Sequence, residues 1–508
     1  MIAERTNVKL LITGLLLSIL VAAMDNTIVA TAMGTIVGDL GGIESFVWVT
    51  AAYMVASMAA MPIFGKLSDM FGRKRFFIFG LFVFLLGSAL CGLAQSMVQL
   101  SIFRAIQGIG GGALLPIAFT IVFDVFPPEK RGKMTALLGA TFGISSVFGP
   151  LIGAYITEYI SWHWIFYVNI PIGIISLFCV IKSYKESPNR MKQSIDWGGA
   201  FTLVAAVVSF MFALELGGNK YDWNSVPIIT LFSIFAAMFI AFLFIETKAK
   251  DPIISFSLFK KPLFASSQIL AFLYGATFIP LTVYIPIFVQ AVFGGSTTNA
   301  GLILTPMMLG SVVGSAISGM MQTKTSFRNL MYVSVISFAV GLFLLSMMTP
   351  DTSRSLVTIF MVLSGVGVGF SFSLLPTSSI HNLEPTQRGT ANSTNAFFRT
   401  LGMTIGITIF GSIQSSRFTE KITESFKNQP LGTEFLANQD LSGIFTSEVR
   451  SQIPTDILNI IINSMSTSIT GVFRIAFFVL LSALIFVFLM GNEKVVITKK
   501  EKDNRGGL

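Results

Sequence analysis

The chain is poor in charge. Only 12% of its 508 residues are Asp, Glu, Lys or Arg, whereas 53% are hydrophobic. A soluble globule of this length needs more polar surface, so the composition predicts a protein that lies in a lipid bilayer. The formal net charge of +9 lies in short loops between apolar segments rather than on one soluble domain, which argues against a nucleic-acid partner.

Cysteine and histidine are nearly absent. Cys91 and Cys179 both lie within apolar runs, so neither a disulfide framework nor a thiolate metal site is expected. His163 and His381 lie apart from any cluster of nucleophiles or metal ligands, which argues against an enzyme. The chain also lacks a G-x-x-x-x-G-K-[ST] loop, so ATP is not the expected energy source. We therefore expect no metal and no bound cofactor.

Long apolar runs are abundant. A helix that spans a bilayer needs about 20 apolar residues. We therefore predict an all-α integral membrane protein with fourteen spans, near residues 10–32, 46–64, 76–94, 98–122, 136–156, 164–181, 197–216, 226–245, 264–288, 300–321, 330–348, 355–376, 394–414 and 470–490.

Lys and Arg gather in loops on one side of these spans, within residues 66–75, 130–133, 182–192 and 248–261. Cytoplasmic loops of membrane proteins carry such an excess, and the intervening short loops hold almost none. We expect a multi-pass protein of the cell membrane with both termini in the cytoplasm. The run after Arg5 and Lys9 is too long for a signal peptide and lacks an A-x-A cleavage site, so we interpret it as an uncleaved first span.

The sequence repeats itself at an offset of 257 positions. Six residues recur, namely Gly108 as Gly365, Gly110 as Gly367, Gly112 as Gly369, Pro128 as Pro385, Arg131 as Arg388 and Gly132 as Gly389. The offset joins span 4 to span 12, which predicts a duplicated six-span half with two extra spans between the copies. We expect an N-terminal bundle at 1–181, inserted spans at 182–261, a C-terminal bundle at 262–490 and a cytoplasmic tail at 491–508.

Two charged side chains lie inside predicted spans. Asp25 lies well within span 1, where an ionised carboxylate is costly, and it is our candidate proton site. Arg104, in span 4, lies about one helical turn before Gln107 and needs a partner, and we assign it to proton coupling as well. The repeat copy has Met361 at the position of Arg104, so this charge belongs to one half only. The alternatives are a hydrogen-bonded packing residue for Asp25 and a purely structural interhelical pair for Arg104.

A short charged turn, GKLSDMFGRKR, begins at Gly65 between two apolar runs. Gly65 and Gly72 permit a tight turn, and Asp69 and Arg73 are spaced to pair if the helix continues between them. The turn resembles the loop between spans 2 and 3 of the major facilitator superfamily, whose members are secondary transporters. The resemblance implies that Asp69, Arg73 and Asp124 latch the cytoplasmic side while the cavity faces outward. The alternative is a solvated turn that only sets the topology.

Span 5 contains GATFGISSVFGPLIGA, whose small residues form a groove for a neighbouring helix and whose proline favours a kink. This segment resembles the antiporter signature of drug exporters, with Ala154 where a second glycine is usual. The residues that carry the motif are Gly139, Gly143, Gly149, Pro150 and Gly153. With MDNTIV, WHWIFYVNIPIG and FFRTLGMTIG, it resembles the fourteen-span drug:proton antiporter family over nearly the whole chain, although His163 stands where that family usually has Arg.

The resemblance implies a major facilitator fold of two six-helix bundles with two additional central spans. It also implies export of small hydrophobic, often cationic compounds in exchange for protons by alternating access. Candidate substrate or cavity residues are Asn26, Gln107, Arg399 and Glu215. Two other functions stay open: a dedicated exporter of one metabolite or lipid, and a receptor or sensor on a transporter scaffold. The sequence indicates no particular oligomeric state.

Residues 415–469 form a long polar segment that the span count places outside the membrane. Its runs FTEKITESF and TDILNIIINSM have helical spacing, so we expect an amphipathic hairpin on the outer surface. A lid, a partner site and a segment without function are equally compatible with this pattern.

Overall fold

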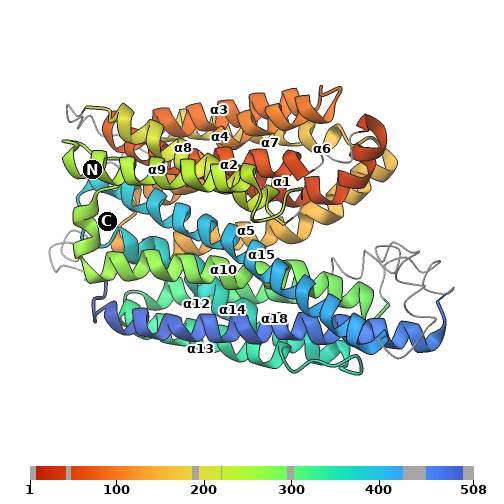
Figure 1. The fold of residues 1–508 in the computed structure, drawn as a ribbon. Coiled ribbons are helices and arrows are strands. Elements are labelled where there is room, and N and C mark those ends of the chain that lie inside the picture. The colour runs from red at the N-terminus through yellow and green to blue at the C-terminus, as the bar shows by residue number, and fades with distance from the viewer. Residues whose placement is uncertain are drawn as a thin grey trace.

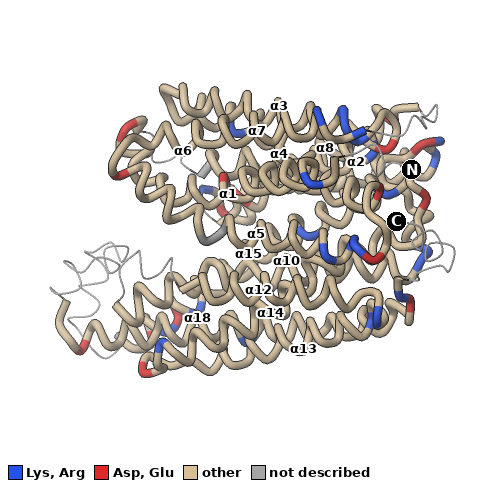
Figure 2. Tube along the Cα trace, turned by 180° about the vertical axis from the view of Figure 1, so that it is seen from behind, with Lys and Arg blue, Asp and Glu red and all other residues tan. Residues whose placement is uncertain are grey.

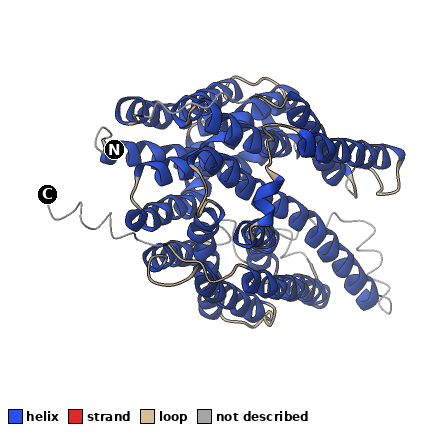
Figure 3. Cartoon of the chain, turned by 90° about the vertical axis from the view of Figure 1, so that its left-hand side faces the viewer, coloured by secondary structure: helices blue, strands red, loops and turns tan. Residues whose placement is uncertain are grey.

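The computed structural model describes residues 7–41, 47–185, 194–218, 220–294, 303–426 and 453–495. Every named element in these ranges is a helix. Figure 3 views the end of the molecule near the chain termini and shows the helices packed side by side. The predicted all-helical class is confirmed.

The helices follow the predicted order of spans. The first seven spans are α1 (Val8–Leu40), α2 (Val47–Phe71), α3 (Arg73–Cys91), α4 (Met97–Val125), α5 (Pro128–Tyr159), the pair α6 (Trp164–Tyr167) and α7 (Asn169–Ser183), and α8 (Trp197–Leu216). The others are α9 (Val226–Lys248), α10 (Pro262–Ala291), α12 (Thr305–Met321), α13 (Phe327–Leu345), α14 (Arg354–Ser379), α15 (Arg388–Phe426) and α18 (Thr455–Leu489). Two short 3-10 helices, Phe256–Lys260 and Pro385–Gln387, precede α10 and α15.

Length and composition allow 13 of the described helices to cross a membrane, with α6 and α7 counted as one segment. The remaining predicted span corresponds to α12, which is described over 17 residues and follows residues outside the described part. The fold is therefore consistent with the predicted fourteen spans.

The helices lie side by side in two groups (Figure 1). The N-terminal group, α1 to α7, surrounds a buried apolar cluster that includes Phe77 and Phe84. The C-terminal group, α10 to α18, surrounds a second cluster that includes Phe338 and Phe473. The beginning of α1 and the end of α18 lie at the same end of the molecule, as an even number of crossings requires. The exact domain boundaries stay a prediction.

Equivalent glycine contacts occur within each of the two groups. In the N-terminal group, Gly108 and Gly112 of α4 lie against the backbone carbonyls of Tyr53 and Ser57 in α2. In the C-terminal group, their repeat copies Gly365 and Gly369 of α14 lie against the carbonyls of Met307 and Ser311 in α12. Each glycine leaves no room for a β-carbon, so the same close helix crossing is built twice.

The two groups meet through a second repeated contact. Gly132 of α5 lies against Gly319 of α12, and its repeat copy Gly389 of α15 lies against Gly65 of α2. Both contacts join one group to the other, the first through backbone atoms and the second through the backbone and neighbouring side chains. The repeat detected in the sequence therefore relates the contacts between the groups as well as those within them.

The helices α8 and α9 come between the groups in the chain. They pack on each other through Phe210 and Phe235, whose ring centres are 4.7 Å apart. In addition, α8 contacts α2 through Phe212 and Trp48, whose ring centres are 4.8 Å apart. Only 11% of the most apolar stretch of α9 is buried inside the protein. Such an exposed apolar helix suits contact with lipid.

The ends of α15 and α18 correct the expectation for residues 415–469. Residues 418–426 are the last turns of α15, and residues from Thr455 onward are the first turns of α18. The predicted helical character is confirmed, but these parts continue the spans instead of forming a separate hairpin. With 39 residues, α15 is about 58 Å long, well beyond the roughly 30 Å of a hydrocarbon core. Ile422, Ile457 and Ile461 pack the two extensions together; residues 427–452 lie outside the described residues.

Candidate functional site

A buried ion pair joins α1 and α4. Asp25 and Arg104 are both fully buried, and the Arg104 guanidinium contacts the Asp25 carboxylate through Nη1. Arg104 also donates to Gln107 Oε1 at 2.7 Å and to the Val49 carbonyl at 3.2 Å. Because an unpaired charge inside a span is costly, each of these two residues explains how the other is tolerated.

Amide and hydroxyl groups complete this cluster. Gln107 and Asn169 donate to Asp25 Oδ1 at 2.8 and 2.9 Å, and both also donate to Ser88 Oγ at 2.9 Å. The cluster therefore draws on α1, α3, α4 and α7 of the N-terminal group. Hydrogen bonds from these groups and from Arg104 hold both carboxylate oxygens of Asp25 in place.

The ring of Tyr53, in α2, separates this cluster from a cavity. The guanidinium carbon of Arg104 lies 4.3 Å from the centre of the Tyr53 ring. Tyr53 also lines the cavity, whereas Asp25 and Arg104 do not. One aromatic side chain thus contacts both the ion pair and the space in which a ligand could bind.

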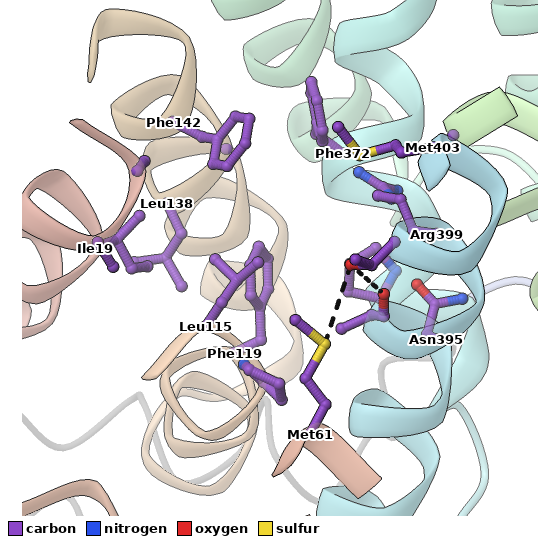
Figure 4. A pocket seen from close by; sticks show the side chains of 18 of the residues that line it. Ile19, Met61, Leu115, Phe119, Leu138, Phe142, Phe372, Asn395, Arg399 and Met403 are labelled. Carbon is purple, nitrogen blue, oxygen red and sulfur yellow. Dashed lines mark hydrogen bonds between the residues drawn. The ribbon is translucent and has the colours of Figure 1, made fainter. Parts of the chain in front are cut away.

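The cavity lies between the two helix groups. Residues of α1, α2, α4 and α5 line it on one side and residues of α10, α14 and α15 on the other, around about 1330 Å³ that includes space open to solvent. Figure 4 shows Phe142 and Leu115 facing Phe372, Met403 and Arg399 across this space. The lining is rich in aromatic and methionine side chains, which accommodate ligands of varied shape.

A polar latch closes the two groups at one end. Asp69 pairs with Arg73 and accepts hydrogen bonds from the Gly389 and Thr390 amides at 2.8 and 2.7 Å. Arg73 donates to the Pro385 carbonyl at 2.6 Å and to Asp124 at 2.9 Å. The sequence-predicted trio of Asp69, Arg73 and Asp124 therefore comes together, and it reaches across to the C-terminal group.

A second arginine extends this latch. Arg388, at the start of α15, donates to Asp124 Oδ1 at 3.0 Å. Charged residues gather at this end of the molecule, where the chain termini also lie (Figure 2). The Asp69 side chain is fully buried.

Two glycines shape the turn beneath the latch. At Gly72 the backbone has φ 109°, a conformation that L side chains rarely adopt, and this residue ends the helical path from α2 to α3. The helix does not continue from Asp69 to Arg73, yet the two side chains form the expected pair across the break. At Gly65, a β-carbon would meet Ser393 and the Gly389 carbonyl.

The glycine motif of α5 faces two neighbours. Gly149 and Gly153 lie against Thr27, Ile28 and Thr31 of α1, so they bring α5 close to the helix that carries Asp25. Gly143 and Gly139 face Ser311 and Ser315 of α12, at 2.9 and 3.2 Å from an added β-carbon. Pro150 lies within α5, which continues through it. The motif therefore connects the N-terminal group to α12 of the C-terminal group.

Other predicted site residues are distributed differently. Arg399 lines the cavity, while Gln107 belongs to the buried Asp25 cluster and Glu215 is not among the lining residues. The side chain of Asn26 lies outside the described residues.

Sequence reasoning missed Tyr53, Ser88 and Asn169 as site residues. Asn169 lies in the segment WHWIFYVNIPIG and Arg388 lies in the repeat, so sequence motifs could have pointed to both residues. Nothing in the sequence distinguishes Tyr53 and Ser88 from other residues of their spans. Among the residues that the structure describes, no group of three or more His, Cys, Asp or Glu could hold a metal ion.

Comparisons with known proteins agree with this architecture. A family model described as "Major Facilitator Superfamily" matches residues 15–407. The chain is 62% identical to "Multidrug resistance protein 3" of Bacillus subtilis (strain 168), over 98% of both chains. It is 34% identical to "Multidrug transporter protein MdtP" of the same organism, over 94% of this chain and 91% of that one.

Solved structures share the fold at low sequence identity. The proton:xylose symporter XylE has a TM-score of 0.62 and 13% identity, over 99% of this chain and 100% of that chain. The human organic anion transporter MFSD10 has a TM-score of 0.60 and 14% identity, over 93% of this chain and 99% of that chain. At these identities the likeness concerns the fold alone.

Proposed function

Because the chain belongs to the major facilitator superfamily, we propose that it is a proton-coupled multidrug exporter of the cell membrane. It moves hydrophobic, often cationic compounds outward by alternating access. The names of its relatives at 62% and 34% identity, a multidrug resistance protein and a multidrug transporter, support this proposal. The proposal excludes an enzymatic reaction and requires no cofactor.

One observation carries the proposal: Tyr53 contacts both the apolar cavity and the buried Asp25–Arg104 pair. Substrate in the cavity and a proton on Asp25 can therefore influence each other without direct contact. Breaking a buried ion pair on one side only costs about 3–5 kcal/mol. Protonation of Asp25 would leave Arg104 without its counter-charge, so the helices that hold the two residues are expected to rearrange.

The latch provides the other requirement of alternating access. Positive-inside topology assigns the end with the basic loops and both termini to the cytoplasm. In the described conformation the hydrogen bonds of Asp69, Arg73 and Arg388 hold the two groups together at that end. We infer that this conformation is closed to the cytoplasm and that opening requires these bonds to break.

The test is transport by purified protein in liposomes with an imposed pH gradient. Wild-type protein should accumulate several chemically unrelated dyes against their gradients, and Asp25→Asn should abolish this uphill accumulation. Asp222→Asn, in the turn between α8 and α9, is the matched control and should transport like wild type. Transport of one compound alone would favour a dedicated exporter, and transport of none would favour a receptor or sensor. Full uphill transport by Asp25→Asn would eliminate Asp25 as the coupling site.

A further inference from the structure

Arg399 is a cavity residue with an unusual charge environment. Arg73, Arg104 and Arg388 each contact a carboxylate. Arg399 has no carboxylate partner among the described residues, and its hydrogen bond is to the Ser371 carbonyl at 3.2 Å. A guanidinium has five N–H donors, so most of them are available to a ligand.

The surrounding lining contains no competing anion. Among the described residues that line the cavity, none is Asp or Glu, and Arg399 is the charged one. Nearby polar groups are already engaged: Asn395 donates to Gln268 Oε1 at 3.3 Å, and the Tyr274 hydroxyl bonds Ser334 at 2.6 Å. A positive charge without a counter-ion in an apolar space favours the entry of a negative one.

Aromatic rings adjoin this charge. The Arg399 guanidinium carbon lies 4.7 Å from the centre of the Phe372 ring. Phe372 in turn lies 5.5 Å from Phe142 and 6.0 Å from Phe278, measured between ring centres. Figure 4 shows the Arg399 side chain directed into the space between the helix groups, beside Phe372. A ligand that placed an oxyanion on Arg399 would therefore have its apolar body among these rings.

We propose that Arg399 is an anion subsite that lets this transporter bind aromatic compounds carrying a carboxylate. The carboxylate forms a two-pronged hydrogen-bonded pair with the guanidinium, and the aromatic body packs against Phe372. This assignment rests on the proposed function, which it extends from hydrophobic and cationic compounds to organic anions. In this conformation the cavity offers such an anion a guanidinium partner, whereas its described lining offers a permanent cation no carboxylate.

The test uses three pyrene probes that share an aromatic body and differ in the head group: 1-pyrenebutyrate, 1-pyrenebutanol and 4-(1-pyrenyl)butyltrimethylammonium. Binding to the full chain in nanodiscs is measured by equilibrium dialysis against empty nanodiscs, at equal pH on both sides. Wild-type protein should bind the acid most tightly. A hydrogen bond to a charged group contributes enough that Arg399→Gln should weaken acid binding roughly tenfold or more, while binding of the alcohol changes little.

Two further variants control this measurement. Arg474→Gln removes an exposed arginine of α18 that does not line the cavity, and it should bind all three probes like wild type. Arg399→Lys keeps the charge and should retain the preference for the acid over the alcohol, though more weakly. If Arg399→Gln fails to bind even the alcohol, the wild-type order of affinities and the Lys variant decide the question.

The inference is overturned if wild-type protein binds the ammonium probe as tightly as the acid, or if acid binding survives Arg399→Gln unchanged. It can fail while the transporter still exports dyes in liposomes. Conversely, Arg399-dependent binding of the acid without any uphill transport would retain the subsite and refute the proposed function.

Discussion

Tyr53 lies between the cavity and the buried Asp25–Arg104 pair. Its ring packs on Arg104 at 4.3 Å and also lines the cavity. A cation–π contact of this kind is worth about 0.5–2 kcal/mol, most when it is shielded from water. A ligand that displaces the ring is therefore expected to weaken its contact with Arg104. A rearrangement of the Asp25–Arg104 pair is in turn expected to move the Tyr53 ring that lines the cavity.

We predict that Tyr53→Leu partly uncouples transport, because Leu keeps an apolar wall but loses the aromatic face on Arg104. Substrate-dependent proton flux in proteoliposomes should fall several-fold relative to substrate binding, by an amount comparable to the energy of a cation–π contact. Tyr53→Phe keeps the ring and should retain most of the coupling. Phe82→Leu makes a similar aromatic-to-Leu change at an exposed position of α3 that does not line the cavity, and it serves as the control. Unaltered proton flux in the Leu variant would remove Tyr53 from the coupling path.

Single residues also show what sequence can predict about the site. Asp25 and Arg104 were detectable because a charge in an apolar run is costly and needs a reason. Ser88 and Asn169 were not, because neutral polar residues are common in spans and only the folded structure shows them bonded to Asp25 or to each other. The cavity role of Tyr53 depends on the crossing of α2 and α4, which no local pattern specifies.

At the scale of helices, the turn between α2 and α3 and the start of α15 form one unit. Asp69 accepts the Gly389 amide, the Thr390 amide and the Thr390 hydroxyl, at 2.8, 2.7 and 2.9 Å. These amides lie in the first turn of α15, where a negative charge is favourable. The carboxylate thus fastens α2 to the end of a helix in the other group.

We predict that Asp69→Asn weakens this connection, because an amide accepts fewer hydrogen bonds and carries no charge for Arg73. Transport in liposomes should fall several-fold while membrane insertion stays normal, which membrane fractionation can check. Arg75→Gln alters an exposed cation of the same turn and should leave the transport rate unchanged. A normal rate for Asp69→Asn would mean that the latch does not contribute to the cycle.

The close approach of α5 to α1 gives a second prediction for helices. At Gly149 a β-carbon would clash with Thr27 Oγ1 and lie 3.2 Å from the Met24 carbonyl, whereas at Gly34 it would meet nothing within 4 Å. Gly149→Ala should therefore destabilise the protein by about 1–3 kcal/mol and lower its thermal unfolding temperature in detergent. Gly34→Ala should not lower that temperature. Equal unfolding temperatures for the two variants would contradict the described α1–α5 contact.

Helices were more predictable than the segments that join them. Each expected span is represented in order because its apolar run is long enough to dominate local preference. The expectation of a separate hairpin was wrong for the described extensions of α15 and α18, because their polar residues did not indicate that they continue membrane helices. Their spacing predicts a helix but not whether it continues a span.

For the whole molecule, the residues that repeat between the two groups set the helix packing, whereas the buried charges of the site lie at positions that differ between the groups. Equivalent glycines make equivalent helix crossings in both groups. Two charges of the N-terminal group do not repeat, because Arg104 corresponds to Met361 and Asp124 corresponds to His381. Burial lowers the pKa of His381 from its ordinary value, more than nearby Glu493 raises it. Among the described residues, the carboxylates of the latch, Asp69 and Asp124, both come from the N-terminal group.

The movement of the two groups can be tested where they touch. Thr135 of α5 and Ser373 of α14 are fully buried, and their hydroxyl oxygens lie 3.2 Å apart across the boundary between the groups. Replacing both by Cys, in a chain that carries Cys91→Ala and Cys179→Ala, should allow a disulfide to form on oxidation. The double variant is matched by each single variant treated with the same oxidant.

Because alternating access requires the two groups to separate where Thr135 and Ser373 touch, the oxidised double variant should lose liposome transport. A reductant should restore it. The single variants should be unaffected by either treatment. If the opposite conformation is populated during turnover, substrate and a pH gradient should also slow disulfide formation, because the two positions then spend less time in contact. Full transport by the cross-linked protein, with the cross-link verified by mass spectrometry, would show that the groups do not part here. The movement that alternates access would then have to occur elsewhere in the molecule.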